Sequence, residues 1–241
     1  MGVVYKNNPI VEAICAFDFT DSTEWDSTNT GLLYNRISTK YPQKSDNVNF
    51  NFLIKKNGPE LFQRHLSRFT SNDNEKLVQI GKNFISINKL APYNSWELFY
   101  TDIKNVFGSY TEVLSSWQVK RIGLRYINRI SLEYSSFKME DFFHFRPNIS
   151  PEYFPKGNSS FQLLQTYNYP DTDEKVNVQL NSEDINEKED SITISLDIDQ
   201  YIDNQTFSEV NTILPLIDEM HKKVEIIFNS STTENFKKKI S

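Results

Sequence analysis

The segment Arg121-Ile122-Gly123-Leu124-Arg125-Tyr126-Ile127-Asn128-Arg129-Ile130 has the alternating pattern of a β-strand. Alternation places Arg121, Arg125 and Arg129 on one face and the apolar residues Ile122, Leu124, Tyr126 and Ile130 on the other. At a rise of roughly 3.3 Å per residue, these arginines repeat about every 13 Å. Guanidinium groups stay charged and bind carboxylates or phosphates through paired donors. The segment therefore predicts a strand that carries three charged donors along one face of a sheet.

On the N-terminal side of this strand, residues 1–117 read as one unit with the order β-α-β4-α. An apolar, β-prone run after Pro9 predicts a strand over 10–19, and helical spacing predicts a helix that Pro42 ends. Turn residues then separate four expected strands, over 48–54, 62–69, 76–80 and 84–88. A long amphipathic helix, capped by Ser95, is expected over 96–114.

On the C-terminal side, residues 118–241 read as a second unit with the order β-α-β3-α. After the arginine strand we expect a short helix at 139–145 and strands at 161–169, 175–180 and 191–199, with an acidic loop at 181–190. The last helix, over 207–228, contains Pro215, which should kink it or lie near its first turn. The sequence thus predicts an α+β fold of two similar antiparallel sheet-plus-long-helix halves. This order is that of TATA-binding-protein-like or helix-grip domains, and the analogy concerns the fold alone.

The composition limits the classes of function. The formal net charge is −6 and the pI is about 5.2, which argues against a general nucleic-acid coat, because phosphate binding depends on summed positive charge. No run approaches the ~20 apolar residues of a membrane span, and no secretory signal is visible at the N-terminus. The single cysteine, Cys15, forms no internal disulfide and is expected in the core. We therefore expect a cytoplasmic protein that does not bind membranes.

Several familiar chemistries have no motif here. The three histidines, His65, His144 and His221, are far apart in the sequence and give no zinc spacing. His221 is expected at a helix surface. A Gly-x-Ser-x-Gly motif and a phosphate-loop lysine motif are also missing. The sequence accordingly predicts no catalytic residue, no metal site and no cofactor.

The last expected strand carries two carboxylates at alternate positions. Asp197 and Asp199 alternate with apolar residues, so they share a strand face at roughly 6–7 Å. Paired carboxylates at that spacing could bind a metal or serve acid–base chemistry. The other interpretation is that they belong to the ordinary solvated side of an antiparallel sheet.

Four segments together resemble a known family: 8–13 (Asn-Pro-Ile-Val-Glu-Ala), 25–33, 121–130, and His221 with Phe228. This is an uncharacterised, sporadically distributed family of bacterial proteins of about 250 residues, with an N-terminal Asn-Pro-Ile-x-Glu-Ala and a central Arg-x-Gly-Leu-Arg-Tyr-Ile-Asn-Arg segment. The resemblance implies a scattered accessory protein, of a kind associated with mobile-element, toxin-antitoxin or phage-defence loci. It assigns no catalytic residue.

The arginine row has two interpretations. In the first, Arg121, Arg125 and Arg129 form ion pairs across strands with Glu12, Asp18, Asp197 or Asp199, each pair contributing about 0.2–1 kcal/mol. In the second, they form an anion-binding site on an open sheet face. The candidate binding residues are Arg121, Arg125, Arg129, Glu12 and Tyr126. Aromatic residues near turns add a candidate protein interface: Tyr5, Tyr153, Phe154, Tyr167 and Tyr169.

These features favour a non-enzymatic binding or regulatory accessory protein. It would recognise a protein partner or an anionic ligand through the arginine-bearing sheet, and a homo-oligomer is compatible with this interpretation. One alternative is a nucleic-acid-binding protein. Another is a hydrolase or nucleotide-acting enzyme that uses Asp197 and Asp199.

Overall fold

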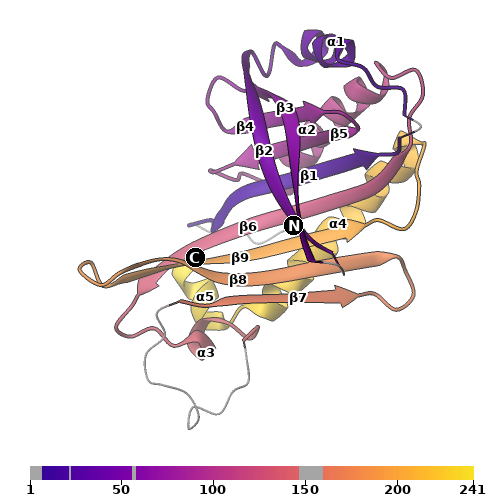
Figure 1. The fold of residues 1–241 in the computed structure, drawn as a ribbon. Coiled ribbons are helices and arrows are strands. Elements are labelled where there is room, and N and C mark those ends of the chain that lie inside the picture. The colour runs from indigo at the N-terminus through magenta and orange to yellow at the C-terminus, as the bar shows by residue number, and fades with distance from the viewer. Residues whose placement is uncertain (1–6, 22, 56–57, 147–159) are drawn as a thin grey trace.

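A computed structural model describes residues 7–21, 23–55, 58–146 and 160–241 (Figure 1). Within these residues, nine strands form one antiparallel sheet in the order β2-β3-β4-β5-β1-β6-β9-β8-β7. The strands are β1 (Ile10–Phe19), β2 (Gln43–Lys55), β3 (Gly58–Thr70), β4 (Lys76–Gly81), β5 (Phe84–Leu90), β6 (Val119–Glu133), β7 (Gln162–Asn168), β8 (Glu174–Asn186) and β9 (Ser191–Ile202). The helices are α1 (Thr28–Ile37), α2 (Trp96–Thr111), α3 (Met139–Phe142), α4 (Val210–Ser231) and α5 (Glu234–Ile240).

The predicted α+β class and the order of the predicted elements agree with the structure. β1 and β6 lie side by side in the middle of the sheet, and each also pairs with the last strand of its own stretch of chain, β5 or β9. The N-terminal strands therefore occupy one side of the β1–β6 pair and the C-terminal strands the other. That the two halves are duplicates stays a prediction.

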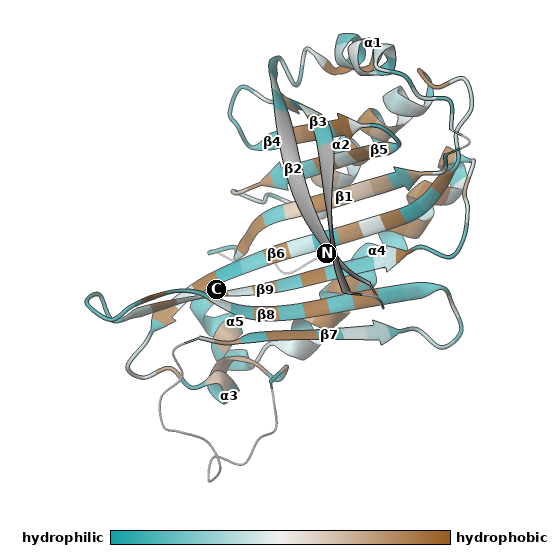
Figure 2. Ribbon diagram, viewed as in Figure 1, coloured by the Kyte–Doolittle hydropathy of each residue, from teal (hydrophilic) through white to brown (hydrophobic). Residues whose placement is uncertain are grey.

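One face of the sheet carries the long helices. Along β1, the side chains of Ala13, Cys15, Phe17 and Phe19 are fully buried, while the residues between them are partly exposed. Figure 1 shows α2 and α4 behind the sheet, and in Figure 2 apolar and polar residues alternate along the central strands. Phe17 stacks on Phe107 of α2, with ring centroids 4.1 Å apart. Alternation thus directs one apolar face toward the helices and leaves the other face polar.

Two details of the C-terminal half differ from prediction. The acidic loop expected at 181–190 is wrong, because β8 continues to Asn186 and pairs with β9 through Ile185 and Ile192. The sequence did not show that β8 and β9 extend this far, because the charged side chains of the extension are exposed and resemble those of a loop. The second difference is the short helix α5, which follows α4 and buries Phe236 and Ile240, beyond the helix expected over 207–228. Pro215 lies inside α4.

Within the described residues, no helix combines the length and apolar character that a bilayer crossing requires. The longest helix, α4, has a polar side and packs on the sheet through Ile213, Ile217 and Met220. Its apolar residues therefore form one stripe that covers the core.

The stack of Phe107 on Phe17 should be a main source of stability. Phe107→Ala removes a fully buried ring and leaves a cavity, so we expect a loss of about 3–5 kcal/mol in the free energy of unfolding, measured by chemical denaturation. Leu98→Ala is the matched control on the same helix, because Leu98 is 59% exposed, and should change stability by less than about 0.5 kcal/mol. Similar losses in both variants would contradict this account of how α2 is held.

Candidate functional site

The three arginines of β6 all form ion pairs with carboxylates of β8 and β9. Arg121 Nη2 donates to Asp199 Oδ2 at 3.0 Å, and Arg129 Nε donates to Glu183 Oε2 at 2.6 Å. Arg125 binds Asp197 through two nitrogens, with Nε 2.8 Å from Oδ1 and Nη2 also in contact with Oδ2. The row therefore consists of charge pairs on the sheet face opposite the helices.

These pairs differ in how far solvent reaches them. The Asp197 side chain is only 11% exposed, whereas Arg129 is 48% and Glu183 29% exposed. The hydrogen bonds to Asp197 raise the pKa of Arg125. Burial raises the pKa of the Asp199 carboxyl, although Arg121 and Arg125 act in the opposite direction. Of the three, the Arg125–Asp197 pair is bidentate, and its carboxylate is the least exposed.

The other two candidate residues lie in different surroundings. Glu12 Oε1 accepts a hydrogen bond from Asn88 Nδ2 at 2.6 Å, on the same face as the arginines. Tyr126 points to the helix-covered face and is 3% exposed. The structure thus gathers the arginines and Glu12 on one face and places Tyr126 beneath the helices.

Asp197 and Asp199 share a face as predicted, yet each is bound by an arginine. No group of three or more His, Cys, Asp or Glu side chains suited to a metal ion occurs among the described residues. Their arrangement is that of structural ion-pair partners.

The aromatic residues proposed as an interface are dispersed. Tyr5, Tyr153 and Phe154 lie outside the described residues. Tyr167 is 48% exposed on the edge strand β7. Tyr169 is partly buried, with Lys223 Nζ 5.0 Å from its ring centroid.

A cleft of about 540 Å³ opens on the helix-covered side, where α2 and α4 meet above the central strands. Its floor comes from β1, β6 and β9, through Ile10, Tyr126 and Ile198. Its walls come from the start of α2, the preceding loop and the C-terminal two thirds of α4. The exposed residues Asn94, Glu97, Lys222 and Asn229 lie among its lining, so the cleft opens to solvent. Its volume is within the range of small-molecule sites, about 300–1,000 Å³.

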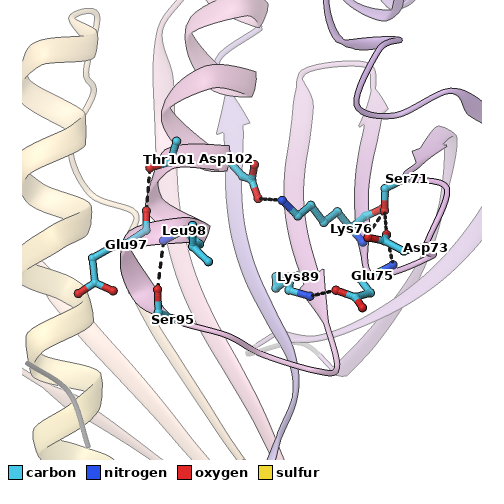
Figure 3. Close-up of polar contacts among 10 residues, drawn as sticks. All are labelled: Ser71, Asp73, Glu75, Lys76, Lys89, Ser95, Glu97, Leu98, Thr101 and Asp102. Carbon is cyan, nitrogen blue, oxygen red and sulfur yellow. Dashed lines mark hydrogen bonds and ion pairs between the residues drawn. The ribbon is translucent and has the colours of Figure 1, made fainter. Parts of the chain in front are cut away.

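Buried or partly buried ion pairs fix the two helices that form the walls. Lys76 of β4 reaches Asp102 of α2 at 2.7 Å, and Asp102 is 5% exposed (Figure 3). Ser95 caps α2 by accepting a hydrogen bond from the Leu98 N–H, which sets where the helix begins (Figure 3). On the other side, Lys223 of α4 pairs with buried Glu174 of β8 at 2.5 Å. The walls are therefore held by the sheet before any ligand arrives.

A chain of hydrogen bonds joins three side chains in the cleft. Tyr93 Oη lies 3.3 Å from Tyr126 Oη, which lies 3.0 Å from His221 Nδ1. His221 Nε2 faces Glu225 Oε1 at 3.6 Å. A carboxylate beside Nε2 favours a proton on that nitrogen, so Nδ1 accepts from Tyr126 and Tyr126 in turn accepts from Tyr93. The oxygen of Tyr93 is then left as a hydrogen-bond acceptor at the end of the chain.

The imidazole of His221 is also held by stacking. Its ring lies parallel to Trp96, with centroids 4.1 Å apart and an angle of 12° between the planes. Trp96 Nε1 donates to Asp218 Oδ1 at 2.8 Å, and this hydrogen bond lowers the pKa of Asp218. Two helices thus meet through one stacked pair and one hydrogen bond.

Burial fixes the protonation of these groups near neutral pH. It lowers the pKa of His221 to about 4 and raises the pKa values of the Tyr93 and Tyr126 phenols. Imidazole and phenols are therefore all neutral at pH 7, and Asp218 is ionised.

The expectation that His221 lies at a helix surface is wrong, since its side chain is only 12% exposed. A signal was present in the sequence, because Ile217, His221, Val224 and Phe228 follow at spacings of four, three and four on one helical stripe. The role of Tyr93 had no comparable signal, because it lies in a loop after Pro92 and depends on contacts distant in sequence.

No protein-family model matches this chain, and no curated protein or solved structure matches it either. Geometry is therefore the basis for any assignment. The resemblance based on four segments stays a prediction, but three of those segments meet here: 8–10, Tyr126 with Asn128, and His221 with Phe228 all line the cleft.

The difference in shielding between the arginine pairs predicts different mutational costs. Arg125→Ala leaves the nearly buried Asp197 carboxylate without its bidentate partner and should lower the free energy of unfolding by about 1–2 kcal/mol. Arg129→Ala breaks an exposed pair and should cost at most about 1 kcal/mol. Urea denaturation of both variants checks the order. A larger loss for Arg129→Ala would show that shielding does not set the strength of these pairs.

The depressed pKa of His221 predicts a loss of stability in acid. In the unfolded chain His221 takes up a proton near pH 6.5, whereas in the folded protein it does so only near pH 4. The contribution of neutral His221 to the free energy of unfolding is therefore complete above about pH 6.5 and is lost as the pH falls toward 4. A shift of this size is worth on the order of 3 kcal/mol. In His221→Phe, which can still stack on Trp96, the unfolding free energy should fall less between pH 7 and pH 4.5 than in wild type. A wild-type imidazole that titrates near pH 6.5 by NMR would contradict this prediction.

Proposed function

We propose that this protein is a binding protein that takes up a small organic molecule in the cleft between α2 and α4. The observation that carries the proposal is the cleft itself, whose walls are fixed by Lys76–Asp102 and Lys223–Glu174 and whose interior groups are already ordered by hydrogen bonds and stacking. A pre-ordered site loses little conformational freedom on binding. Aromatic walls with a few placed polar groups are typical of ligand pockets.

The chemistry of the interior favours binding over catalysis. General acid–base catalysis works best when a group titrates near the working pH. In this cleft the pKa of His221 is shifted to about 4 and the phenol pKa values are raised, so each group keeps one protonation state at pH 7. The only cysteine, Cys15, is fully buried. These groups are suited to holding a ligand.

We also propose that the bound state is communicated to a protein partner through the arginine face. β6 links the two surfaces, because Tyr126 forms the floor of the cleft and the adjacent Arg125 lies on the open face. A free anion is a weaker candidate there, since each arginine already binds a carboxylate. Carboxylates and cations of a partner protein could replace the ion pairs of this row one for one, so that the net charge of the interface changes little. An accessory or regulatory role in a defence-type locus rests on the family resemblance alone.

The prediction that the two halves of the chain are similar units agrees with this placement of the site. If residues 1–117 and 118–241 are similar units, the cleft lies at their junction, with its α2 wall from the first unit and its α4 wall from the second. Ligand sites occur preferentially at such junctions. The strand order on either side of β1 and β6 supports the proposal.

The two alternatives receive less support. A nucleic-acid-binding face needs unpaired cations, whereas Arg121, Arg125 and Arg129 are all paired. A hydrolase that uses Asp197 and Asp199 would have to release both carboxylates from their arginines.

The proposal predicts that blocking the cleft abolishes binding without unfolding the protein. Asn94 is exposed and lines the cleft, so Asn94→Trp should fill its mouth. Thermal-shift and isothermal-titration screening against a panel of organic amines, carboxylates, phosphates and nucleosides should find a compound that binds wild type and binds Asn94→Trp at least about tenfold more weakly.

Asn35→Trp, at an exposed position of α1, is the matched control and should bind as wild type does. Ligands that bind wild type and Asn94→Trp equally well would place recognition elsewhere. If no compound of the panel binds wild type, the proposed ligand-binding function is contradicted.

A further inference from the structure

The charged groups around the cleft are unequally distributed. Three carboxylates line it, from Glu97, Asp218 and Glu225, against one cation, Lys222. His221 adds no positive charge near neutral pH, because burial lowers its pKa to about 4. Lys222 is already engaged, with its ammonium 3.1 Å from Asp218 and 2.6 Å from Glu219. The lining is therefore net negative.

Two of these carboxylates have no cationic partner among the described residues. Asp218 is bound by Trp96 and Lys222, but Glu97 and Glu225 form no ion pair there at a pH where His221 is neutral. Glu97 is exposed at the first turn of α2, and Figure 3 shows its carboxylate on the side of that helix nearest α4. Glu225 lines the cleft from α4, which forms the opposite wall. Unpaired carboxylates on facing walls attract a cation.

Among the described residues, the phenolic and indole donors of the cleft are all used within the protein. The hydrogen-bond chain from Tyr93 through Tyr126 to His221 uses the phenolic protons in sequence and leaves the oxygen of Tyr93 to accept. The indole N–H of Trp96 is used by Asp218. A ligand that brings N–H donors would complete this chain, and one that brings only acceptors would not.

Aromatic rings supply the remaining surface. Tyr93, Trp96, Tyr126 and Phe228 line the cleft with Ile198 and Val224. Such walls bury an apolar body, and electron-rich rings also attract an alkylammonium or guanidinium group. Anionic ligands would meet carboxylates and an occupied lysine.

From these observations we propose that the cleft binds an organic cation, namely a small amine or guanidine on an apolar or aromatic body, with its charged group between Glu97 and Glu225. This inference rests on the proposed ligand-binding function and specifies the ligand class. The charged group would donate hydrogen bonds to the two carboxylates and to the oxygen of Tyr93. Its body would lie against the aromatic walls.

The test uses three molecules of similar shape and different charge. 2-Phenylethylamine is a cation at pH 7, 2-phenylethanol is neutral and phenylacetate is an anion. Isothermal titration at low salt should give the amine a dissociation constant at least about tenfold below that of the alcohol, with no detectable binding of phenylacetate. Glu97→Gln combined with Glu225→Gln should remove this preference for the amine and leave the weak binding of the alcohol.

Glu140→Gln is the matched control, because Glu140 is an exposed carboxylate on α3 outside the cleft, and it should leave the preference intact. Melting temperatures show whether each variant is folded. Equal or tighter binding of the alcohol or the anion, or an amine preference that survives the double substitution, would overturn the cationic ligand class. If the alcohol or the anion binds more tightly than the amine but Asn94→Trp still weakens its binding, the proposal that the cleft binds a small molecule stands. If Asn94→Trp does not weaken the binding, both proposals are overturned.

Discussion

The pairing of β1 with β6 is the constraint on which the rest of this structure depends. These two strands join the N-terminal and C-terminal parts of the sheet, and each lies between two neighbours. Between the register shifts at the two ends of β1, alternation commits every second residue to one face, so Phe17 and Leu124 must be covered while Asp18 and Arg125 remain at the surface. A shift of one residue would bury the arginines. Register at the centre therefore decides which side the helices cover.

The cleft follows from covering that face with two helices that start on different parts of the sheet. α2 packs against β5 and α4 against β9, so β1 and β6, together with Ile198 of β9, form the floor where the helices meet. Side chains at such a junction are half-buried, and polar groups there need partners. Tyr126 satisfies its hydroxyl with Tyr93 on one side and His221 on the other. The same contacts that complete the core also prearrange a site.

The sequence was informative wherever local pattern controls structure. Alternation located β1 and β6 and predicted that Cys15 is buried, and the ion-pair interpretation named Asp197 and Asp199, which do bind Arg125 and Arg121. It failed where partners are remote. Glu183 lay in a stretch taken for a loop, yet it pairs with Arg129, and the burial of His221 depends on Trp96, 125 positions earlier in the chain. The cleft as a whole is built from five separate segments, so no single pattern could reveal it.

The two faces of β6 have opposite electrostatic character, and this bears on what each can recognise. On the open face, three guanidiniums are matched by three carboxylates, so a partner there would exchange existing ion pairs and gain specificity more than affinity. On the helix side, Glu97 and Glu225 have no cationic partner among the described residues at a pH where His221 is neutral, and a ligand that supplies one meets no competing ion pair there. Burial of charge is favourable only when a partner arrives with it. The cleft therefore offers unpaired carboxylates to a ligand, whereas the arginine row, although it is the most conspicuous feature of the sequence, already has its partners within the chain.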